Sequence, residues 1–461
     1  MKNLHRPIYH LMPQTNWMND PNGPVYYNGE YHLFYQYNPF GNKWGSIHWG
    51  HASSSDMVHW RHWPIALSPS PELGEEHCFS GCTVVNQGVP TVIYTSIGDG
   101  DRNALTGAQQ WLAQSHDNML TFVKSSANPI MTSELHGNMK ITDWRDPFVF
   151  QDREAWFMVL GGMHNTHGCA LLYRSDDLFT WQFMRILLEA PGETWECPNF
   201  FPLGDRYVLV YSPVGPVSYY VGTWQEDFSF VPSQSGLVDH SGMQGYYATN
   251  VFVDQEGRTI MWAWIPENAR GDFNPECPYA GIQALPRVIT LGYDDRLRMH
   301  PLPELTSLRN HHWQQQAVVL SSKEICSDIH GKALEILVKA RCRAKSAVLY
   351  LRVLRSHDQN EETIIKYDFS QHEITIDRSN SSLSDLPHAF NLSAKLIEYT
   401  DTLTLHVFID HCVIEVFANY QESITTCVYP LSSDSVHVSM SASEGAMIDL
   451  ESFDVWDMQQ I

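Results

Sequence analysis

The stretch VYYNGEYHLFY at residues 25–35 contains two short runs rich in Tyr, Val, Leu and Phe that flank the dipeptide Asn28-Gly29. Asn-Gly is a strong signal for a two-residue hairpin turn, because both positions of that turn need positive φ. Four further turn signals are flanked in the same way: Gly88, Asp152-Arg153, Gly204-Asp205 and Glu256-Gly257. About the first 300 residues are therefore predicted to contain five β-hairpins.

A second element recurs between these hairpins. It reads SDMVHW at residues 55–60, SHDNMLTF at residues 115–122 and SDDLFTW at residues 175–181. Its aspartates, Asp56, Asp117 and Asp177, are 61 and 60 residues apart. This is the spacing of a repeated supersecondary unit and not of local structure. Each copy is predicted to comprise a strand, a turn and an outer strand.

The chain as a whole is predicted to be all-β. Short segments rich in Val, Ile, Tyr, Phe and Trp alternate with Gly, Asn, Asp and Pro, and long stretches with helical periodicity are scarce. Five hairpin units predict a five-bladed β-propeller, because the radial closure of a propeller limits the number of exposed strand edges. Five separate hairpins in a large sandwich would also fit, but the periodic Ser/Asp/Trp element favours the propeller.

A second domain is predicted in the C-terminal third of the chain. The Trp-rich and Gly-rich texture fades after PLPEL at residues 301–305, and the polar stretch NHHWQQQ at residues 310–316 resembles a linker. We therefore expect a propeller domain over residues 1–305 and a second domain over residues 315–461. Alternating apolar runs in the second domain predict a C-terminal β-sandwich. It contains no pair of acids that suggests catalysis.

The composition is that of a soluble globular protein with two or three domains: 461 residues, of which 43 % are hydrophobic. Its formal net charge of −23 disfavours nucleic acid and anionic membranes as partners, because those partners need a positive field. A neutral ligand is compatible with this charge. The many aromatic residues suit sugar binding, because flat rings pack against the C–H faces of sugars, but they are equally normal in β-cores.

The region near residue 1 contains no apolar run long enough for a signal peptide or a membrane span. The chain is therefore expected in the cytoplasm, or outside the cell if a leader has been removed from it. Its nine cysteines are irregularly spaced, and no CxxC pair or Cys/His cluster suggests zinc. We expect reduced, mostly buried thiols rather than a disulfide framework.

Three acidic residues lie beside Pro or Cys before apolar runs, each with a Trp nearby. They are Asp20 in NWMNDPNG, Asp146 in DWRDP and Glu196 in WECPN. The composition of the first stretch would also suit an Asx turn, because Asn, Asp, Pro and Gly are the usual turn formers. In a propeller, however, equivalent strand starts converge on the central channel. Acids that are 126 and 50 residues apart in the sequence can therefore meet there.

Such a meeting of acids would suit glycoside hydrolysis. That reaction needs two carboxyl groups in different protonation states, one that attacks or stabilises the sugar and one that donates a proton. Arg145 is adjacent to Asp146 and is expected to hold that carboxylate ionised. Glu196 has to be protonated at rest to act as an acid. Nearby apolar rings such as Trp195 and Phe200, and repulsion from ionised aspartates, are expected to favour its protonated form.

In these motifs the chain resembles glycoside hydrolase family 32, which includes invertases, inulinases and levanases. Residues 17–23 resemble the nucleophile motif of the family, Arg145-Asp146-Pro147 its stabiliser motif and Glu196-Cys197 its acid/base motif, in the order of the family. Further stretches resemble family sequences at residues 36–39, 44–45, 49–51, 79–81 and 280–287. The resemblance covers nearly the whole chain and implies a five-bladed propeller followed by a β-sandwich.

The resemblance implies a retaining β-fructofuranosidase that acts on sucrose or fructo-oligosaccharides through a covalent intermediate. Asp20 would be the nucleophile, Glu196 the general acid/base and Asp146 a stabiliser of the transition state. The carboxyl groups of Asp20 and Glu196 would then lie about 5–5.5 Å apart. Seven further residues would contact the bound fructosyl unit: Asn19, Gln36, Trp44, Phe79, Ser80, Arg145 and Trp264. Packing between blades would also explain the three aromatic residues, and Cys197 would tune the acid/base residue by contact.

The resemblance implies no metal ion and no cofactor, and its expected partner is a small sugar. Neither nucleic acid nor a membrane is expected as a partner, and the oligomeric state is left open. One position departs from the family. Where many members carry an acid or amide before a Phe-Tyr-Ala segment, this chain has Gly245, so a polar group on the leaving-group side is expected to be missing.

Three alternatives remain open at this point. Transfer of the fructosyl unit to another sugar would use the same catalytic residues as hydrolysis. Hydrolysis of sucrose phosphate would need a basic cluster at the mouth of the pocket, and the sequence identifies none. A sugar-binding propeller without turnover is the alternative from another class of protein. Such proteins usually lose an acid, whereas all three acids are present here.

Overall fold

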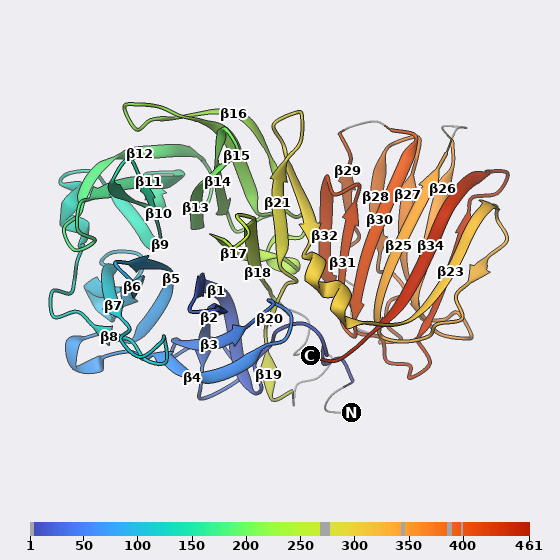
Figure 1. The fold of residues 1–461 in the computed structure, drawn as a ribbon, viewed down its shortest axis with the longest axis horizontal. Coiled ribbons are helices and arrows are strands. Elements are labelled where there is room, and N and C mark those ends of the chain that lie inside the picture. Colours follow the sequence, from blue (N-terminus) through green and yellow to red (C-terminus); the bar gives the residue numbers. More distant parts are fainter. Residues whose placement is uncertain (1–3, 268–276, 343–345, 385–389, 398–399) are drawn as a thin grey trace.

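The structure is a computed structural model that describes residues 4–267, 277–342, 346–384, 390–397 and 400–461 (Figure 1). Regular structure in these residues is almost entirely β-strand, and the helical segments are short 3₁₀ turns. No helix in this part of the chain is long and apolar enough to cross a membrane. The prediction of an all-β chain is therefore confirmed.

Residues 16–301 contain five sheets. The first has the order β19-β1-β2-β3-β4 and comprises β1 (Asn16–Tyr27), β2 (Glu30–Asn38), β3 (His48–Ser54), β4 (Arg61–Leu67) and β19 (Tyr279–Ala280). The second comprises β5 (His77–Asn86), β6 (Val89–Ile97), β7 (Gln109–Gln114) and β8 (Val123–Lys124). The third comprises β9 (Ile141–Asp152), β10 (Ala155–His164), β11 (His167–Ser175) and β12 (Gln182–Pro191).

The fourth and fifth sheets complete this half of the chain. The fourth comprises β13 (Glu196–Leu203), β14 (Arg206–Ser212), β15 (Ser218–Trp224) and β16 (Phe230–Leu237). The fifth has the order β17-β18-β21-β22, from β17 (Tyr247–Val253), β18 (Thr259–Ile265), β21 (Arg287–Leu291) and β22 (Leu297–Pro301), and β20 (Ile282–Gln283) pairs with β18. The strands β1, β5, β9, β13 and β17 are called the inner strands below.

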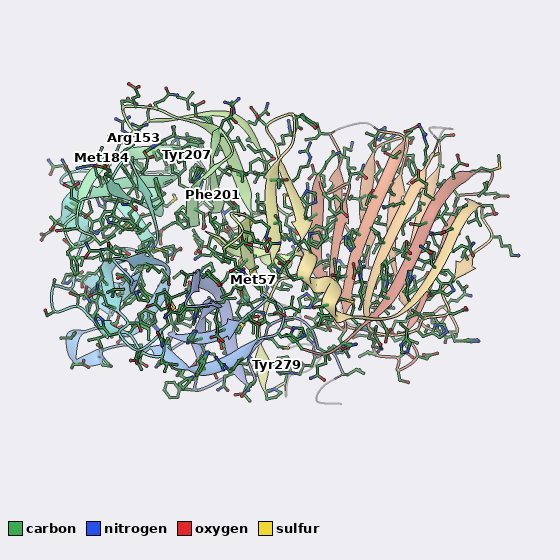
Figure 2. All side chains as sticks on the ribbon, in the orientation of Figure 1. Met57, Arg153, Met184, Phe201, Tyr207 and Tyr279 are labelled. Atoms are coloured by element: carbon green, nitrogen blue, oxygen red, sulfur yellow. The ribbon has the colours of Figure 1, made fainter. Side chains whose placement is uncertain are left out.

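The inner strands form a closed series of contacts. Each contacts the inner strand of the next sheet, and β17 contacts β1 in turn. A cavity of about 280 Å³ lies at their C-terminal ends, where Tyr26, Val84, Phe150, Phe201 and Val251 each come from a different inner strand. Figure 1 shows the five sheets grouped around this region in one half of the molecule. Side chains such as Phe201 fill the layers between the sheets (Figure 2).

The predicted hairpins and repeats are confirmed. All five turn signals join adjacent antiparallel strands, and at the first of them Asn28 and Gly29 have φ of 49° and 89°. Each Ser/Asp element lies between the third and fourth strands of a sheet. In all three copies the aspartate, Asp56, Asp117 or Asp177, accepts at least one hydrogen bond from a backbone N–H group of the following turn. The aspartate therefore fixes the turn that leads to the outer strand.

Two six-stranded sheets make up the other half and share one hydrophobic core. The first comprises β23 (Arg309–Leu320), β34 (Ile448–Met458), β25 (Ala333–Arg341), β30 (Thr402–Asp410), β31 (Val413–Ala418) and β32 (Glu422–Cys427), in that order. The second comprises β24 (Ile325–Cys326), β33 (His437–Ala442), β26 (Val348–Arg355), β27 (Thr363–Asp368), β28 (Glu373–Asp377) and β29 (Leu392–Lys395).

The interpretation of residues 310–316 as a linker is wrong. These residues lie within β23, which pairs with β34 along most of its length. β23 is an edge strand, and most of its polar side chains are exposed, so its composition is that of a solvated sheet edge. Its pairing starts at Arg309, six residues before the expected start of the second domain at 315.

A buried ionic cluster joins the two halves. Arg287 of β21 lies 3.0 Å from Asp239 and 2.9 Å from Glu415 of β31, and all three side chains are fully buried. His10 bonds to Asp410 and Glu415 at 2.8 and 3.2 Å. Burial alone would lower the pKa of His10, but these two carboxylates raise it to about 9. His10 is therefore charged at neutral pH, and the cluster ties the halves together in one arrangement.

None of the nine cysteines, all of which lie in the described residues, forms a disulfide. Seven of them are buried, and only Cys326 is exposed, while Cys427 is half-buried. The structure thus agrees with the expectation of reduced, mostly buried thiols.

Candidate active site

A cavity of about 350 Å³ opens among the N-terminal parts of the inner strands. Nine of the ten residues predicted for the site line it: Asn19, Asp20, Gln36, Trp44, Phe79, Arg145, Asp146, Glu196 and Trp264. The tenth, Ser80, contacts Asp20 behind the lining. Cys197, which was expected to tune the acid/base residue, also lines the cavity, and four residues that were not predicted for the site complete the lining: Ala104, Asp143, Met243 and Tyr247.

Each inner strand is irregular at the level of this cavity. The pairing register shifts after Met18 in β1, Cys78 in β5, Arg145 in β9, Glu196 in β13 and Tyr247 in β17. Three prolines lie in these irregular segments: Pro21, Pro147 and Pro198. Proline donates no hydrogen bond to a ladder, and a bulge redirects the side chains beside it. The local sequence therefore turns the acids of three different sheets toward one centre.

The carboxylate of Asp20 is held by four donors. Its Oδ2 atom accepts hydrogen bonds from Ser80 Oγ at 2.6 Å, from Gln36 Nε2 at 3.3 Å and from the Cys197 thiol at 3.6 Å. Its Oδ1 atom accepts one hydrogen bond from the described residues, from Asn19 Nδ2 at 3.0 Å. Burial raises the pKa of Asp20, the bond from Ser80 lowers it, and the charge of Glu196 raises it further. The carboxylate is fixed in orientation, and Oδ1, with one donor, keeps more free lone-pair capacity than Oδ2.

Arg145 contacts three acids. Its Nη2 atom lies 2.6 Å from Glu196, its Nη1 atom 3.2 Å from Asp143 and its Nε atom 3.8 Å from Asp146. As expected, Arg145 favours the ionised form of Asp146 and lowers its pKa, although its closest partner is Glu196. Burial raises the pKa of Asp146 to about 7, and the opposing effect of Arg145 does not cancel it. Asp146 is the most deeply buried acid of the cavity, and its desolvation outweighs the attraction of one shared cation.

The surroundings of Glu196 also differ from the expectation. Trp195 and Phe200 belong to a buried cluster between the third and fourth sheets. The carboxyl group of Glu196 instead contacts Arg145 through Oε1 and the hydroxyl of Tyr247 through Oε2. A cation and a phenol therefore take the place of the expected apolar rings, and only the three-dimensional pairing of β13 with its neighbours reveals them.

Cys197 bridges two acids rather than touching Glu196 through its thiol. Its Sγ atom lies 3.6 Å from Asp20 and 3.7 Å from Asp146, and its backbone N–H donates to Asp146 at 3.0 Å. Burial, followed by the two carboxylates, raises the pKa of the thiol. The thiol therefore stays protonated and acts as a weak donor between the two aspartates.

The aromatic residues of the site divide into two kinds. Trp44 is 51 % exposed at the mouth of the cavity, with its ring centre 6.0 Å from that of Phe79. Trp264 is only 8 % exposed and packs edge-on against Trp17 at 5.8 Å. Trp44 is thus available to a ligand that enters the cavity, whereas Trp264 both supports the fifth sheet and forms part of the wall.

The glycine that departs from the family pattern has a packing role. A Cβ atom at Gly245 would lie 2.0 Å from the carbonyl oxygen of Thr425 in β32 of the other half. Gly245 does not line the cavity. Gly245 carries no polar side chain, and the close approach of the two halves accounts for a glycine at this position.

We predict that Gly245→Ala destabilises the protein by about 1–3 kcal/mol, because the backbone of β32 must move to admit the new Cβ. Thermal unfolding measured by calorimetry would test this. Gly331→Ala is the control, since a Cβ there would only reach ordinary contact at 3.4 Å from Leu334. Equal melting temperatures for Gly245→Ala and the wild type would contradict the packing role.

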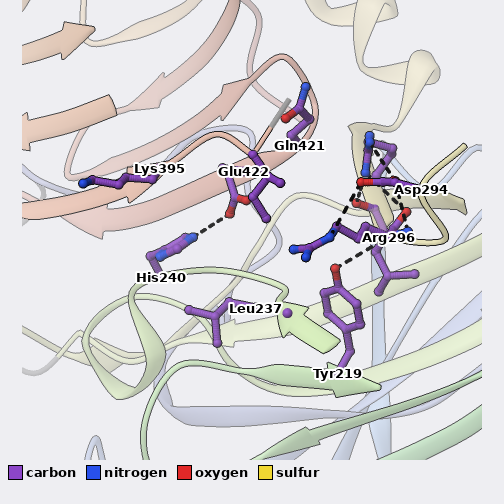
Figure 3. A pocket seen from close by; sticks show the side chains of 12 residues that line it. Tyr219, Leu237, His240, Asp294, Arg296, Lys395, Gln421 and Glu422 are labelled. Atoms are coloured by element: carbon purple, nitrogen blue, oxygen red, sulfur yellow. Dashed lines mark hydrogen bonds and ion pairs between the residues drawn. The ribbon is translucent and has the colours of Figure 1, made fainter. Parts of the chain in front are cut away.

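A second cavity, of about 230 Å³, lies between the two halves (Figure 3). Its acids are already paired, Glu422 with His240 at 2.6 Å and Asp294 with Arg298 at 3.0 Å. No group of three or more His, Cys, Asp or Glu residues suited to a metal ion occurs in the residues that the structure describes.

Two family models match the chain: "Glycosyl hydrolases family 32 N-terminal domain" over residues 10–301 and "Glycosyl hydrolases family 32 C terminal" over residues 304–457. Sucrose-6-phosphate hydrolase of Zymomonas mobilis is 33 % identical over 98 % of this chain and 92 % of that protein. Raffinose invertase of Escherichia coli is 31 % identical over 97 % of this chain and 94 % of that protein. A variant of fructan 1-exohydrolase IIa from Cichorium intybus, solved in complex with 1-kestose, superimposes with a TM-score of 0.89 at 25 % identity, covering 100 % of this chain and 98 % of that one.

Proposed function

This chain belongs to glycosyl hydrolase family 32, and from that membership we propose how its cavity works and which substrates it takes. The chain is a glycoside hydrolase that cleaves β-D-fructofuranosides, the activity that the names of its relatives support. We propose terminal fructosyl units of neutral sugars as its targets. One observation carries the assignment of the site: Asp20, Asp146 and Glu196, from three different sheets, line the same cavity.

We infer that the five sheets are the blades of a five-bladed β-propeller, over residues 1–305, and that the two six-stranded sheets are a β-sandwich. The ring of contacts among the inner strands supports the propeller, as do the two cavities at opposite ends of these strands. The shared core of the six-stranded sheets supports the sandwich, which would begin with β23 at Arg309 rather than at 315. The catalytic cavity would then lie at one end of the propeller axis.

Asp20 would attack the anomeric carbon of the fructosyl unit while Glu196 protonates the glycosidic oxygen. The product of this step is a covalent fructosyl-enzyme and a free leaving group. Glu196, now a carboxylate, would take a proton from water as the water attacks the same carbon, and the configuration of the sugar would be retained. Asp146 would bond hydroxyl groups of the fructosyl ring, and its negative charge would stabilise the positive charge that develops there.

The charge of the cavity supports neutral substrates. Four carboxyl groups line it, and the one cation among the described lining residues, Arg145, already contacts three of them. A phosphate ester on the leaving group would be repelled by the acids. We predict that kcat/KM for sucrose exceeds that for sucrose 6-phosphate by at least about tenfold. Steady-state kinetics on both sugars would test this, and a preference for the phosphate ester would contradict it.

The acids also predict the pH dependence of activity. Burial raises the pKa values of both Asp20 and Asp146, and both groups must be ionised to act. The rise of kcat/KM with pH should therefore occur above the pH at which ordinary carboxyl groups ionise. Ser80 lowers the pKa of Asp20 by its hydrogen bond, so Ser80→Ala should move this rise to still higher pH. At about pH 5 the variant should be roughly tenfold less active than the wild type, with a smaller deficit near pH 8.

Rates on sucrose from about pH 4 to about pH 8 would test this prediction. Ser229→Ala is a matched control, because it also removes a serine–aspartate bond, at 2.7 Å to Asp227, but in an exposed turn far from the cavity. A rise at the same pH in wild type and Ser80→Ala would mean that Ser80 does not control the ionisation of Asp20.

The proposed activity is tested by incubating the protein with sucrose, short inulin oligosaccharides and levan and measuring the fructose released. Release from at least one of these substrates supports the proposal, and their ranking identifies the preferred linkage. Products longer than the substrate at high sucrose would show that fructosyl transfer competes with hydrolysis. A protein that binds these sugars but releases no fructose would instead be a binding propeller without turnover.

A further inference from the structure

The two oxygens of Glu196 have different partners. Oε1 lies 2.6 Å from Nη2 of Arg145, a group that is always charged. Oε2 accepts a hydrogen bond from the hydroxyl of Tyr247. A proton on Oε1 would face the guanidinium and be repelled by it. When Glu196 is protonated, its proton is therefore carried by Oε2, the oxygen that faces Tyr247.

The hydroxyl of Tyr247 has one proton and two acceptors. Its oxygen accepts the backbone N–H of Val214 at 2.8 Å, which fixes the position of the phenol. It lies 3.0 Å from the carbonyl oxygen of Ser212, and Ser212 pairs with Glu196 across the β13–β14 ladder. The O–H bond can therefore point at either Ser212 or Glu196 by rotation about the C–O bond alone, without movement of the ring.

We propose that Tyr247 is a positioning residue whose hydroxyl turns between Ser212 and Glu196 as Glu196 changes its protonation state. This inference rests on the proposed function, because it concerns the acid/base step of that reaction. When Glu196 is protonated, the Oε2 proton is donated to the Tyr247 oxygen or to the glycosidic oxygen of the substrate, and the phenol donates to Ser212. When Glu196 is a carboxylate, the phenol donates to Oε2.

The two positions match the two halves of the reaction. In the first half the proton leaves Oε2 for the leaving-group oxygen, and the phenol turns to stabilise the new carboxylate. In the second half the carboxylate takes a proton from the attacking water, and the phenol turns back to the Ser212 carbonyl. No proton is exchanged between Tyr247 and Glu196, so the phenol only changes the energy of the ionised form.

The phenol keeps its own proton throughout. Burial, followed by the negative charge of Glu196, raises the pKa of Tyr247 far above its usual value. The charged or titratable groups that face Glu196 are Arg145 and Asp146 from β9, Asp20 from β1 and the Cys197 thiol beside it. Among the described residues none of these groups donates a hydrogen bond to Oε2, so Tyr247 is the donor that distinguishes the acid form of Glu196 from the base form.

Tyr247→Phe tests the proposal, and Tyr246→Phe is its matched control. The hydroxyl of Tyr246 is buried without a hydrogen-bond partner in the described residues, so its removal should change neither rate nor pH dependence. Loss of the Tyr247 hydroxyl leaves the carboxylate of Glu196 without its donor. The alkaline limb of kcat/KM should therefore move to higher pH in Tyr247→Phe.

The second readout is leaving-group dependence. A weaker acid should slow cleavage of sucrose about 10–100-fold, in kcat rather than KM. An aryl β-D-fructofuranoside, whose leaving group needs little protonation, should be cleaved at within about threefold of the wild-type rate. This split, together with the shifted alkaline limb, supports the proposal. An unmoved alkaline limb, or an equal loss on both substrates, would overturn it and leave Tyr247 as a structural residue. Failure of the proposed function is distinguishable, because the wild type itself would then release no fructose.

Discussion

Asp20→Ala is expected to lower kcat on sucrose by roughly 10⁴-fold or more, because the covalent step loses its nucleophile and water must attack directly. In the structure four donors fix the orientation of the Asp20 carboxylate: Ser80, Gln36, Asn19 and Cys197. Packing of the side chain alone would not require a fixed orientation of the carboxylate. Single-turnover and steady-state measurements on sucrose would give the loss. Affinity for fructose, measured by calorimetry, should change far less than kcat.

The variant should remain folded. Burial raises the pKa of Asp20, which means that the folded state disfavours its charged form, so above the usual carboxyl range its removal relieves a cost. The melting temperature at neutral pH is therefore expected to be equal to or above that of the wild type. Asp176→Ala, at an exposed position that pairs with Arg174, is the control and should retain full activity. A fully active Asp20→Ala variant would exclude Asp20 as the nucleophile.

Glu196→Gln is expected to lower kcat on sucrose by about 10²–10⁴-fold, because the amide can neither donate the proton to the leaving group nor accept one from water. The loss should depend on the substrate. An aryl β-D-fructofuranoside needs little help in the first step, so it should form the fructosyl-enzyme at a nearly normal rate, and the intermediate should then accumulate.

Azide provides the matched test of the second step, since it attacks without needing a base. With the aryl substrate, azide should restore turnover of Glu196→Gln and yield a fructosyl azide of retained configuration. An equal loss on sucrose and on the aryl substrate, with no response to azide, would mean that Glu196 positions the substrate and does not transfer protons.

The turns that depend only on neighbouring residues could be predicted from the sequence. Asn28-Gly29 requires positive φ at two adjacent positions, and the Ser/Asp elements satisfy the backbone of their own turns. Both features act within a few residues. The acids were found for a related reason, because proline beside Asp20 and Asp146 disturbs the ladder where the chain must turn a side chain inward.

The contacts that could not be predicted from the sequence are those between residues that lie far apart in the chain. Arg145 acts on its neighbour Asp146 as expected, but the fold also brings Glu196, 51 residues away, to 2.6 Å from it. Tyr247 was not predicted for the site, because its hydroxyl gains a role only beside Glu196 in the folded chain. The residues of β23 are polar enough for a linker, and only pairing with β34 makes them a strand. From the sequence Gly245 indicated only a missing polar group, and the carbonyl of Thr425 in the other half, which explains the glycine, becomes visible only in the fold.

The central claim is that Asp20 forms a covalent intermediate that a second nucleophile then resolves from the same face. Cleavage of sucrose in aqueous methanol tests it most directly, because methanol competes with water for the fructosyl-enzyme and gives a product that does not mutarotate. The account predicts methyl β-D-fructofuranoside, identified by carbon NMR in the first minutes of reaction. Methyl α-D-fructofuranoside as the initial product would contradict it, since inversion requires direct attack on the substrate.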